Sequence, residues 1–329
     1  MTLPLASVIR GDFAESRHSG DVILIHRDGA VLDVTGAPEL QILPRSTVKP
    51  LQALAGLTAG VDLDDRQLAV ASGSHTGTDE HVRVVDGLLR RFHLTPADLQ
   101  CVPDLPEDEA TRARLAREGI GPERIRMNCS GKHALMLAAC VTSGWSTAGY
   151  LDPEHPLQVH VRATIEDITG DRPDHVTVDG CGAPVSTVTL AGLAKGFQRL
   201  VTAAPATPQR RVADAMRAHH FLVGGEPHAN SDVMARIPGL LAKGGAEGVI
   251  AMAAADGAAV AIKVADGNPR ATTLIALRSL AALGVDVSAA GDLLDVPVLG
   301  GGRPVGRIEL APELGDALAA TAGAHPGAR

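Results

Sequence analysis

Lysine is scarce in this chain, and most of the lysines that remain lie beside residues that could do chemistry. Five of the thirty cationic residues are lysine and the other twenty-five are arginine. Arginine keeps its proton at physiological pH, whereas a buried lysine can lose its proton and act as a base or a metal ligand. Drift of the composition toward arginine explains Lys195, inside a helical run, but the neighbours of Lys49, Lys132 and Lys263 indicate chemical roles.

Ser46 and Lys49 form the first motif, three residues apart where a helix is expected to begin. Residues at this spacing share one face of a helix, so a neutral lysine could take the proton of the serine hydroxyl and make it a nucleophile. Serine β-lactamases and penicillin-binding proteins use a Ser-x-x-Lys arrangement in this way. The spacing also arises by chance, and a solvated start of a helix is the alternative.

Ser74 lies in the second motif, a loop with a glycine on either side of this serine. Glycine frees the backbone to present the hydroxyl, although a loop of turn residues between two helices fits the pattern equally well. We expect His75 and His81, in the same segment, to be structural or capping groups and not bases.

Lys263 is the only charged residue of an apolar run, residues 258–264. Because a buried, unpaired ammonium group is very costly, this lysine must face solvent or a pocket. Serine–lysine hydrolases place a second lysine on a strand beside the nucleophile, so the position is compatible with a catalytic role.

Cys129, Lys132 and Cys181 form the third motif, on two glycine-containing segments. Thiolates suit zinc, and a neutral lysine amine is a competent third ligand, although it is rarely used. The spacing matches no common zinc finger, and a disulfide between the two cysteines is the alternative, disfavoured in a reducing compartment. Cys101 and Cys140 have apolar surroundings and are expected in the core.

The overall composition predicts a globular, cytoplasmic protein. The 329 residues are 45% hydrophobic but only 2% aromatic, and the net charge is −8. Such a chain can fill an aliphatic core, but it offers few stacking platforms or basic runs for nucleic acid or an anionic membrane. The first residues lack the pattern of a signal peptide, and no stretch is apolar enough to span a membrane.

Short apolar runs near both ends of the chain predict one antiparallel sheet, and amphipathic runs between them predict helices. Asp256-Gly257, between the two late apolar runs, predicts a hairpin turn. We therefore expect a single two-lobed α/β (α+β) domain, with a sheet lobe at about 1–45 and 245–329 and a helical lobe at about 46–244. Residues 318–329 are expected to be a frayed tail. The expected strands are 5–10, 21–26, 30–34, 248–254, 258–264 and 307–310, and the expected helices are 47–59, 80–91, 107–118, 132–143, 156–168, 187–200, 208–220, 231–241 and 269–283.

Taken together, the motifs resemble the rhizobial-type, or class 3, L-asparaginases of the asparaginase II family, over most of the chain. Three residues depart from the family pattern: Thr78, Met127 and Leu135. The matching segments are Arg10-Gly11 with Glu15, His18 and Gly20; Arg45 to Pro50; Ser74-His75 with Gly77 and His81; Asn128 to Ala134; Tyr150-Leu151 with His155-Pro156 and Gln158; Asp179 to Pro184; and Lys243 with Gly245 to Gly248.

The resemblance implies a fold similar to that of serine β-lactamases and glutaminases, and a homodimer. It implies two serine–lysine pairs, and a zinc ion bound by two cysteines and a lysine. It also implies that Asp179 supports the zinc site or holds a water. The implied pairs are Ser46–Lys49 and Ser74–Lys263, the zinc ligands are Cys129, Lys132 and Cys181, and the substrate-binding residues are Arg45, His133 and Asp179.

On this basis we expect hydrolysis of L-asparagine to aspartate and ammonia. Nominally Ser46 attacks the side-chain amide with Lys49 as base, Ser74 and Lys263 relay the proton to the leaving ammonia, and zinc orients the amino-acid end of the substrate. The alternatives are a glutaminase or a β-lactam or peptide hydrolase on the same scaffold. A third alternative is a non-catalytic zinc-binding or amino-acid-binding protein whose serines only donate hydrogen bonds.

Overall fold

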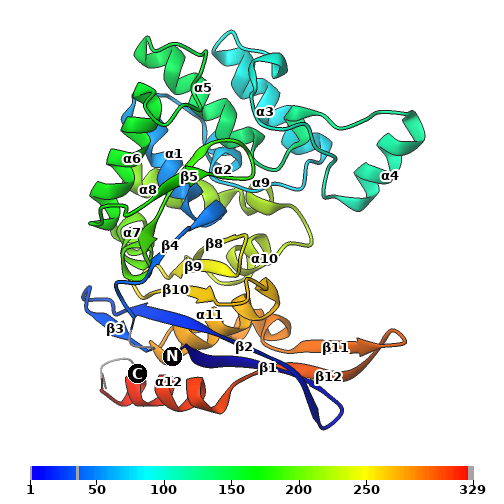
Figure 1. The fold of residues 1–329 in the computed structure, drawn as a ribbon, viewed down its shortest axis with the longest axis vertical. Coiled ribbons are helices and arrows are strands. Elements are labelled where there is room, and N and C mark those ends of the chain that lie inside the picture. Colours follow the sequence, from blue (N-terminus) through cyan, green and yellow to red (C-terminus); the bar gives the residue numbers. More distant parts are fainter. Residues whose placement is uncertain (1, 35–36, 325–329) are drawn as a thin grey trace. The chain divides into compact units, whose positions relative to one another are not determined.

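The computed structural model describes residues 2–34 and 37–324, which form two units (Figure 1). The first, here the sheet unit, comprises Met1–Thr47, Val188–Thr202 and Val233–Arg329. The second, here the helical unit, comprises Val48–Thr187 and Ala203–Asp232. The first boundary lies two residues from the one expected. Residues 188–202 and 233–244, which sequence analysis placed in the helical lobe, belong instead to the sheet unit.

An eight-stranded antiparallel sheet forms the sheet unit, and its strands come from both ends of the chain. This arrangement confirms the predicted fold class. The apolar alternation of the N-terminal segment and the Asp-Gly turn between the two late strands are the signals that predicted it. The strand order is β11 (Val296–Gly300), β12 (Arg303–Leu310), β1 (Leu3–Arg10), β2 (Phe13–Ile25), β10 (Ala259–Val264), β9 (Val249–Ala253) and β8 (Leu241–Gly245), with β3 (Val31–Asp33) paired to β2.

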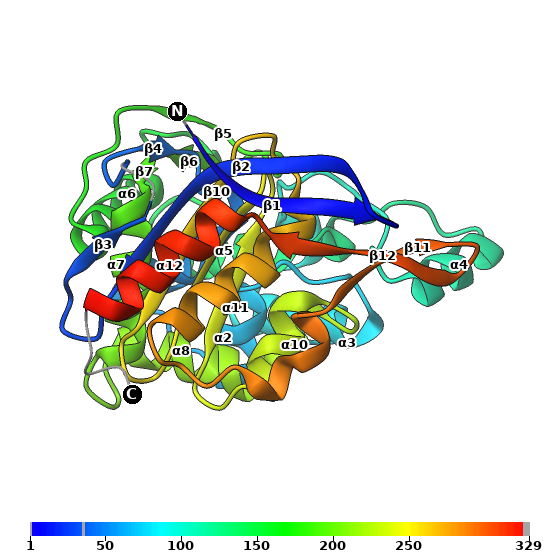
Figure 2. The same ribbon diagram turned by 90° about the horizontal axis from the view of Figure 1, so that it is seen from below.

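Helices cover the sheet. α7 (Leu190–Thr202) packs on β2, β9 and β10, while α11 (Thr272–Ala282) and α12 (Pro312–Ala324) lie side by side over β9, β10 and β1 (Figure 2). Every residue of β10 except Lys263 is buried, as expected for a strand with helices on both faces. The prediction of a frayed tail from residue 318 is wrong for residues 318–324, because these residues belong to α12. Residues 325–329 lie outside the described part of the chain.

The helical unit is built around α5 (Ser130–Ser143), which is buried from its first residue to Cys140. A helix that is apolar on nearly all sides must lie inside a bundle, and α1 (Lys49–Thr58), α2 (Asp65–Ala71) and α3 (Asp79–Arg91) pack around it. α4 stands apart from these helices (Figure 1). The remaining helices are α4 (Glu109–Glu118), α6 (Pro156–Thr169), α8 (Pro208–Ala218) and α9 (His220–Gly224), and the hairpin of β5 (Val176–Val178) and β6 (Pro184–Ser186) completes the unit.

Two local assignments from the sequence were wrong. α2 was not predicted, although Asp64 and Gln67 form a capping box at its start. The helix expected at 231–241 ends at Arg236 in α10 (Ala229–Arg236), and Leu241 already begins β8. No helix in the described residues is long and apolar enough to cross a membrane.

Candidate active site

Lys49 and Ser74 are brought together by two segments of the helical unit. Lys49 is the first residue of α1 and is fully buried. Ser74 lies half-buried in the loop between α2 and α3. Lys49 Nζ donates a hydrogen bond to Ser74 Oγ at 2.8 Å and another to the backbone oxygen of Asn128 at 3.5 Å. If the amine of Lys49 is neutral, it could take the proton of the Ser74 hydroxyl.

The predicted pairing of these groups was different. The predicted pairs were Lys49 with Ser46 and Ser74 with Lys263. Ser46 lies half-buried in the short 3-10 helix η1 (Arg45–Val48), directly before α1. Ser46 and Lys263 belong to the sheet unit, and both predicted pairings stay predictions.

Backbone hydrogen bonds fix the loop that carries Ser74. Ser74 N donates to Val223 O at 2.8 Å, and Thr76 N donates to Gly224 O at 3.0 Å. A β-carbon on Gly73 would come within 2.6 Å of Val223 O. Glycine is therefore needed at position 73 so that the two backbones can approach closely. The sequence had indicated only a flexible turn.

Two cysteines and a lysine lie together in the interior of the helical unit. Cys129 directly precedes α5, Lys132 lies in the first turn of that helix, and Cys181 lies in the turn between β5 and β6. All three are buried, and Lys132 Nζ donates to Cys181 Sγ at 3.1 Å. Cys101 and Cys140 are in the core, as predicted, and all four cysteines are free thiols.

Mutual interactions shift the proton affinities of this cluster. The hydrogen bond from Cys181 lowers the pKa of Cys129, and the charges of Lys49 and Lys132 lower it further against the effect of burial. The same hydrogen bond, together with burial, raises the pKa of Cys181. Burial alone would lower the pKa of Lys132, but attraction to the two sulfurs outweighs burial and raises it. These opposite shifts favour a thiolate at Cys129 and a thiol at Cys181.

The donor chemistry of this cluster is compatible with zinc. Thiolate sulfur and amine nitrogen are ligands that suit Zn²⁺, and binding of the ion would displace the protons that these groups carry. The described residues contain no group of three or more His, Cys, Asp or Glu side chains that could hold a metal. Zinc binding at Cys129 and Cys181 would therefore depend on the amine of Lys132 as a third protein ligand.

His133 follows the cluster on α5 and offers a buried hydrogen-bond donor. Tyr150 accepts a hydrogen bond from Gln100 N, and its hydroxyl lies 2.8 Å from His133 Nδ1. With Tyr150 donating to Nδ1, the proton of the imidazole is on Nε2, which is buried without a partner in the described part of the chain. Burial, and then the charges of Lys132 and Lys49, lower the pKa of His133 and keep the ring neutral.

Asp179 occupies the tight turn that also carries Cys181. Its backbone N–H donates to Ala183 O at 2.9 Å, and its carboxylate accepts from Gly180 N at 2.9 Å. The negative charge of Asp179 also contributes to the raised pKa of Lys132. Asp179 therefore lies close enough to Lys132 to interact with it electrostatically, and its implied role in supporting the zinc site or holding a water stays a prediction.

In the sheet unit, Lys263 faces a hollow of about 420 Å³ whose lining also includes Asp21, Arg45 and Glu247. This position confirms the prediction that Lys263 faces solvent or a pocket. Lys263 Nζ donates to Glu247 O at 2.5 Å and to Val264 O at 2.9 Å. Burial lowers the pKa of Lys263 even though nearby carboxylates oppose the shift, so its neutral form is favoured relative to an exposed lysine.

Strained backbone occurs on this wall of the hollow. Arg45 and Glu247 both have positive φ, 50° and 61°, a region that non-glycine residues rarely occupy. The two side chains form an ion pair at 3.9 Å. Because such strain tends to persist where function requires it, the pair supports the prediction that Arg45 belongs to a binding site.

Asn128 links the serine–lysine pair to the cysteine cluster, a role that sequence analysis missed. Its backbone oxygen accepts from Lys49 Nζ and from His75 N, and its Oδ1 lies 3.0 Å from Cys129 Sγ. Its Nδ2 donates to Glu107 Oε1 at 2.8 Å. The sequence had offered only the position of Asn128 next to Cys129 and its place at the start of a segment that matches the family.

The histidines of the second motif are structural, as expected. His81 and Thr78 form a capping box at the start of α3. The His81 ring stacks between those of His75 and Phe221, with both ring centroids 4.9 Å away. Thr78, one of the departures from the family pattern, therefore serves as a helix cap.

The other two departures lie in the core. Leu135 packs against α1, where a β-carbon on Gly56 would come within 2.5 Å of its side chain. Gly56 thus makes room for the larger residue. Met127 is buried, and its sulfur lies 3.1 Å from Cys129 N.

A family model described as L-asparaginase II matches residues 6–310. The chain belongs to the L-asparaginase II family. Membership of this family implies an amidohydrolase that acts on a small-molecule amide, and the matched region includes every site residue described above. A search of curated proteins finds no match.

Among solved structures, a crystal structure of Mglu is 16% identical to this L-asparaginase II family member, with a TM-score of 0.45 over 80% of this chain and 67% of Mglu. The chain spans 61% of a second Mglu structure. EstCE1, described as a hydrolase with promiscuous acyltransferase activity, is 13% identical, with a TM-score of 0.44 over 78% of this chain and 92% of EstCE1. A Bacteroides dorei protein provisionally described as a β-lactamase is 12% identical, with a TM-score of 0.43 over 74% of this chain and 84% of that protein.

Proposed function

We propose that the protein is a rhizobial-type L-asparaginase, which hydrolyses the side-chain amide of L-asparagine to aspartate and ammonia by serine–lysine catalysis. The observation that carries the proposal is the 2.8 Å hydrogen bond between Lys49 Nζ and Ser74 Oγ in a member of the L-asparaginase II family. Asn128 connects this pair to the buried cluster of Cys129, Lys132 and Cys181.

In the proposed reaction, neutral Lys49 takes the hydroxyl proton as the serine oxygen bonds to the amide carbon. The tetrahedral intermediate then collapses, the lysine returns the proton to the amide nitrogen, and ammonia leaves. Water attacks the resulting serine ester, which releases aspartate and restores the hydroxyl. Because Lys49 hydrogen-bonds to Ser74, we assign the first proton transfer to this pair. A supporting proton relay by Ser46 and Lys263 is proposed on the family resemblance alone.

The remaining residues of the proposed site would hold the substrate. Cys129, Lys132 and Cys181 would bind Zn²⁺, which supplies a Lewis acid that orients the amino-acid end of the substrate. We propose that Arg45 contacts the α-carboxylate and that the unpartnered Nε2–H of His133 donates to a substrate oxygen.

A panel of amides tests the proposal. We expect rapid ammonia release from L-asparagine, slow release from L-glutamine, and no hydrolysis of β-lactams or peptides. Pre-treatment with a strong chelator should weaken the apparent affinity for L-asparagine. Binding of asparagine or zinc without any hydrolysis would favour the non-catalytic binding protein, and faster release from glutamine would favour the glutaminase.

We also propose that the enzyme is a homodimer, an assembly implied only by its resemblance to the rhizobial-type enzymes. Light scattering on the purified protein should give twice the mass of one chain. A stable monomer with full activity would contradict this part of the proposal.

A further inference from the structure

We infer that Glu107 binds the α-ammonium group of the substrate and restricts the enzyme to α-amino-acid amides. The inference rests on the proposed function and adds a specificity-determining residue to it. Glu107 lies just before α4, and neither its sequence context nor the family motifs identified it.

Glu107 is connected to the serine–lysine pair through Asn128. Glu107 Oε1 accepts a hydrogen bond from Asn128 Nδ2 at 2.8 Å. The backbone oxygen of the same asparagine accepts from Lys49 Nζ, the group that binds Ser74 Oγ. The carboxylate is therefore separated from the serine–lysine pair only by Asn128.

The backbone beside Glu107 is rigidly placed. Asp108 N donates to Thr76 O at 3.0 Å, which ties this segment to the loop that carries Ser74. Gly77 has a φ of 76°, and a β-carbon there would come within 3.0 Å of Pro106. Only glycine combines this backbone conformation with such close packing. Gly77 therefore allows the Ser74 loop to pass close to the segment that carries Pro106 and Glu107.

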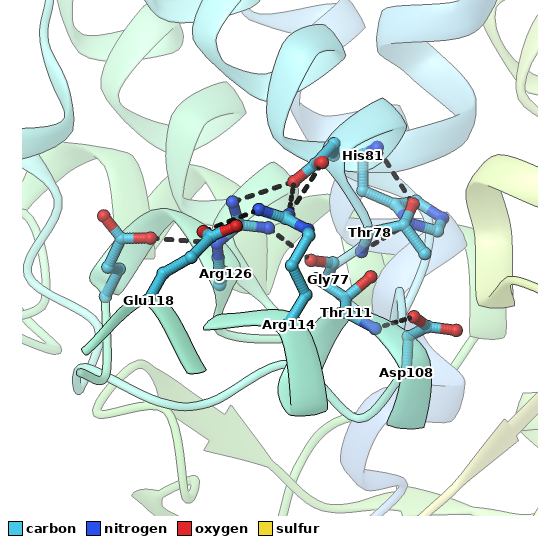
Figure 3. A network of polar contacts seen from close by, with 10 residues as sticks. Gly77, Thr78, His81, Asp108, Thr111, Arg114, Glu118 and Arg126 are labelled. Atoms are coloured by element: carbon cyan, nitrogen blue, oxygen red, sulfur yellow. Dashed lines mark hydrogen bonds and ion pairs between the residues drawn. The ribbon is translucent and has the colours of Figure 1, made fainter. Parts of the chain in front are cut away.

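A network of charged residues fixes the same segment from its other end (Figure 3). Arg114, on α4, forms two hydrogen bonds to the Asp79 carboxylate, at 2.9 and 2.8 Å. Arg126 donates to the same carboxylate and to Gly77 O, at 2.9 and 3.0 Å. Asp108 caps α4 through Thr111 N at 2.7 Å. The backbone that carries Glu107 is thus held in a defined place relative to Ser74.

Charge also favours a carboxylate at this position. Once Lys49 has taken the Ser74 proton in the proposed reaction, it carries a positive charge beside the bound substrate, which would repel the ammonium group of an amino acid. Glu107 is exposed, and its carboxylate has acceptor capacity beyond the one hydrogen bond from Asn128. A carboxylate at this position can offset the repulsion and accept a charge-assisted hydrogen bond from the ammonium group.

Substitution by Glu107→Gln separates charge from shape, because glutamine keeps an oxygen that can accept from Asn128. Succinamate provides the matching substrate, since it is L-asparagine without the α-amino group. We expect E107Q to raise KM for L-asparagine by about 10-fold to 100-fold, the scale of one lost hydrogen bond to a charged group, and to leave succinamate hydrolysis within about twofold. Glu109→Gln, an exposed acid two residues away on α4, is the matched control and should behave like the native enzyme.

Equal effects of E107Q on both substrates, or no effect on either, would overturn the assignment of Glu107. A binding measurement keeps this result separate from the proposed function. Calorimetry should show that native protein binds L-aspartate more tightly than succinate and that E107Q removes the difference, whether or not the preparation releases ammonia. Native protein that binds L-aspartate selectively without hydrolysing L-asparagine would refute only the proposed reaction, whereas an unchanged selectivity in E107Q would refute only the role of Glu107.

Discussion

Lys49 Nζ and Ser74 Oγ are 2.8 Å apart although 25 positions separate the two residues in the chain. If this contact supplies the general base, Lys49→Arg should lower ammonia release by about a hundredfold or more, because arginine keeps the charge but cannot offer a neutral amine. Lys195→Arg, on α7, is the matched control and should retain full activity. Steady-state kinetics check both variants, with circular dichroism to show that they fold. Near-native turnover by K49R would rule out Lys49 as the base.

The zinc prediction concerns Cys181. Purified protein should contain about one zinc per chain, and Cys181→Ser should sharply lower the occupancy, since a hydroxyl is a poor replacement for a soft thiolate. We expect KM for asparagine to rise more than kcat falls. Cys140→Ala removes a core thiol outside the cluster and should keep the metal. Elemental analysis measures the zinc content of each variant, and kinetics on the same samples measure its effect on KM and kcat. Undiminished activity of metal-free protein would remove zinc from the mechanism.

The residues that sequence analysis placed well are those whose local pattern has a single structural solution. Asp256-Gly257 between two apolar runs predicted the β9–β10 hairpin, and the lone charge of Lys263 predicted that it faces solvent or a pocket. Periodicity also found α7, but an amphipathic pattern shows only that one face is buried, not against what, and α7 packs on the sheet and not in the helical lobe.

The site required contacts that no spacing encodes. Cys129, Lys132 and Cys181 converge only because the β5–β6 turn lies against the start of α5, and here the resemblance to a family was the informative signal. The Ser74 partner of Lys49 depends on backbone hydrogen bonds of the loop to Val223 and Gly224, which leave no trace in composition. Glu107 depends on the long segment around α4, whose path the sequence does not reveal.

The close backbone contact at Gly73 gives a stability prediction. Gly73→Ala should destabilise the protein by about 1–3 kcal/mol and lower kcat, because the added carbon must push Val223 away from the Ser74 loop. Gly87→Ala is the control, since the space around Gly87 inside α3 is open. That variant should instead gain up to about 1 kcal/mol from improved helix propensity. Urea denaturation measures both changes, and equal stabilities would contradict the packing argument.

Buried histidines predict a loss of stability in mild acid. Burial lowers the pKa of His81 from 6.5 to about 4, and burial with the nearby charges of His81 and Lys49 lowers the pKa of His75. Between pH 6.5 and pH 4 the unfolded chain binds more protons at His81 than the native protein does, so a fall in pH favours unfolding. The contribution is complete above pH 6.5 and is lost as the pH falls through 4. For His81 it amounts to roughly 3 kcal/mol.

Denaturation between pH 4 and 7 measures this dependence. His81→Asn should flatten the slope, whereas substitution of the exposed His93 by asparagine, which tolerates the positive φ at that position, should leave the slope unchanged. A native protein with no slope in this range would show that His81 titrates normally.

The proposed site predicts that asparagine is hydrolysed far faster than glutamine. In the proposed site, the zinc cluster and Glu107 hold the α-substituents, and the side-chain amide must reach Ser74. The distance between these two ends therefore sets the length of side chain that fits. Glutamine is one methylene longer than asparagine and so is too long. That mismatch alone is worth about 10-fold to 200-fold in binding, and misplacing the amide carbon by about 1 Å could cost a further hundredfold.

Two departures from the family pattern could have relaxed this preference, but the structure gives both another role. Thr78 caps α3, and Leu135 fills the space left by Gly56 in the core. Neither change therefore enlarges the region between Ser74 and the cysteine cluster. Side-by-side measurement of kcat/KM for the two amino acids is decisive. Equal values, or a preference for glutamine, would mean that the α-substituents are bound farther from Ser74 than Glu107 and the cysteine cluster allow, and the glutaminase would then be the better description of this enzyme.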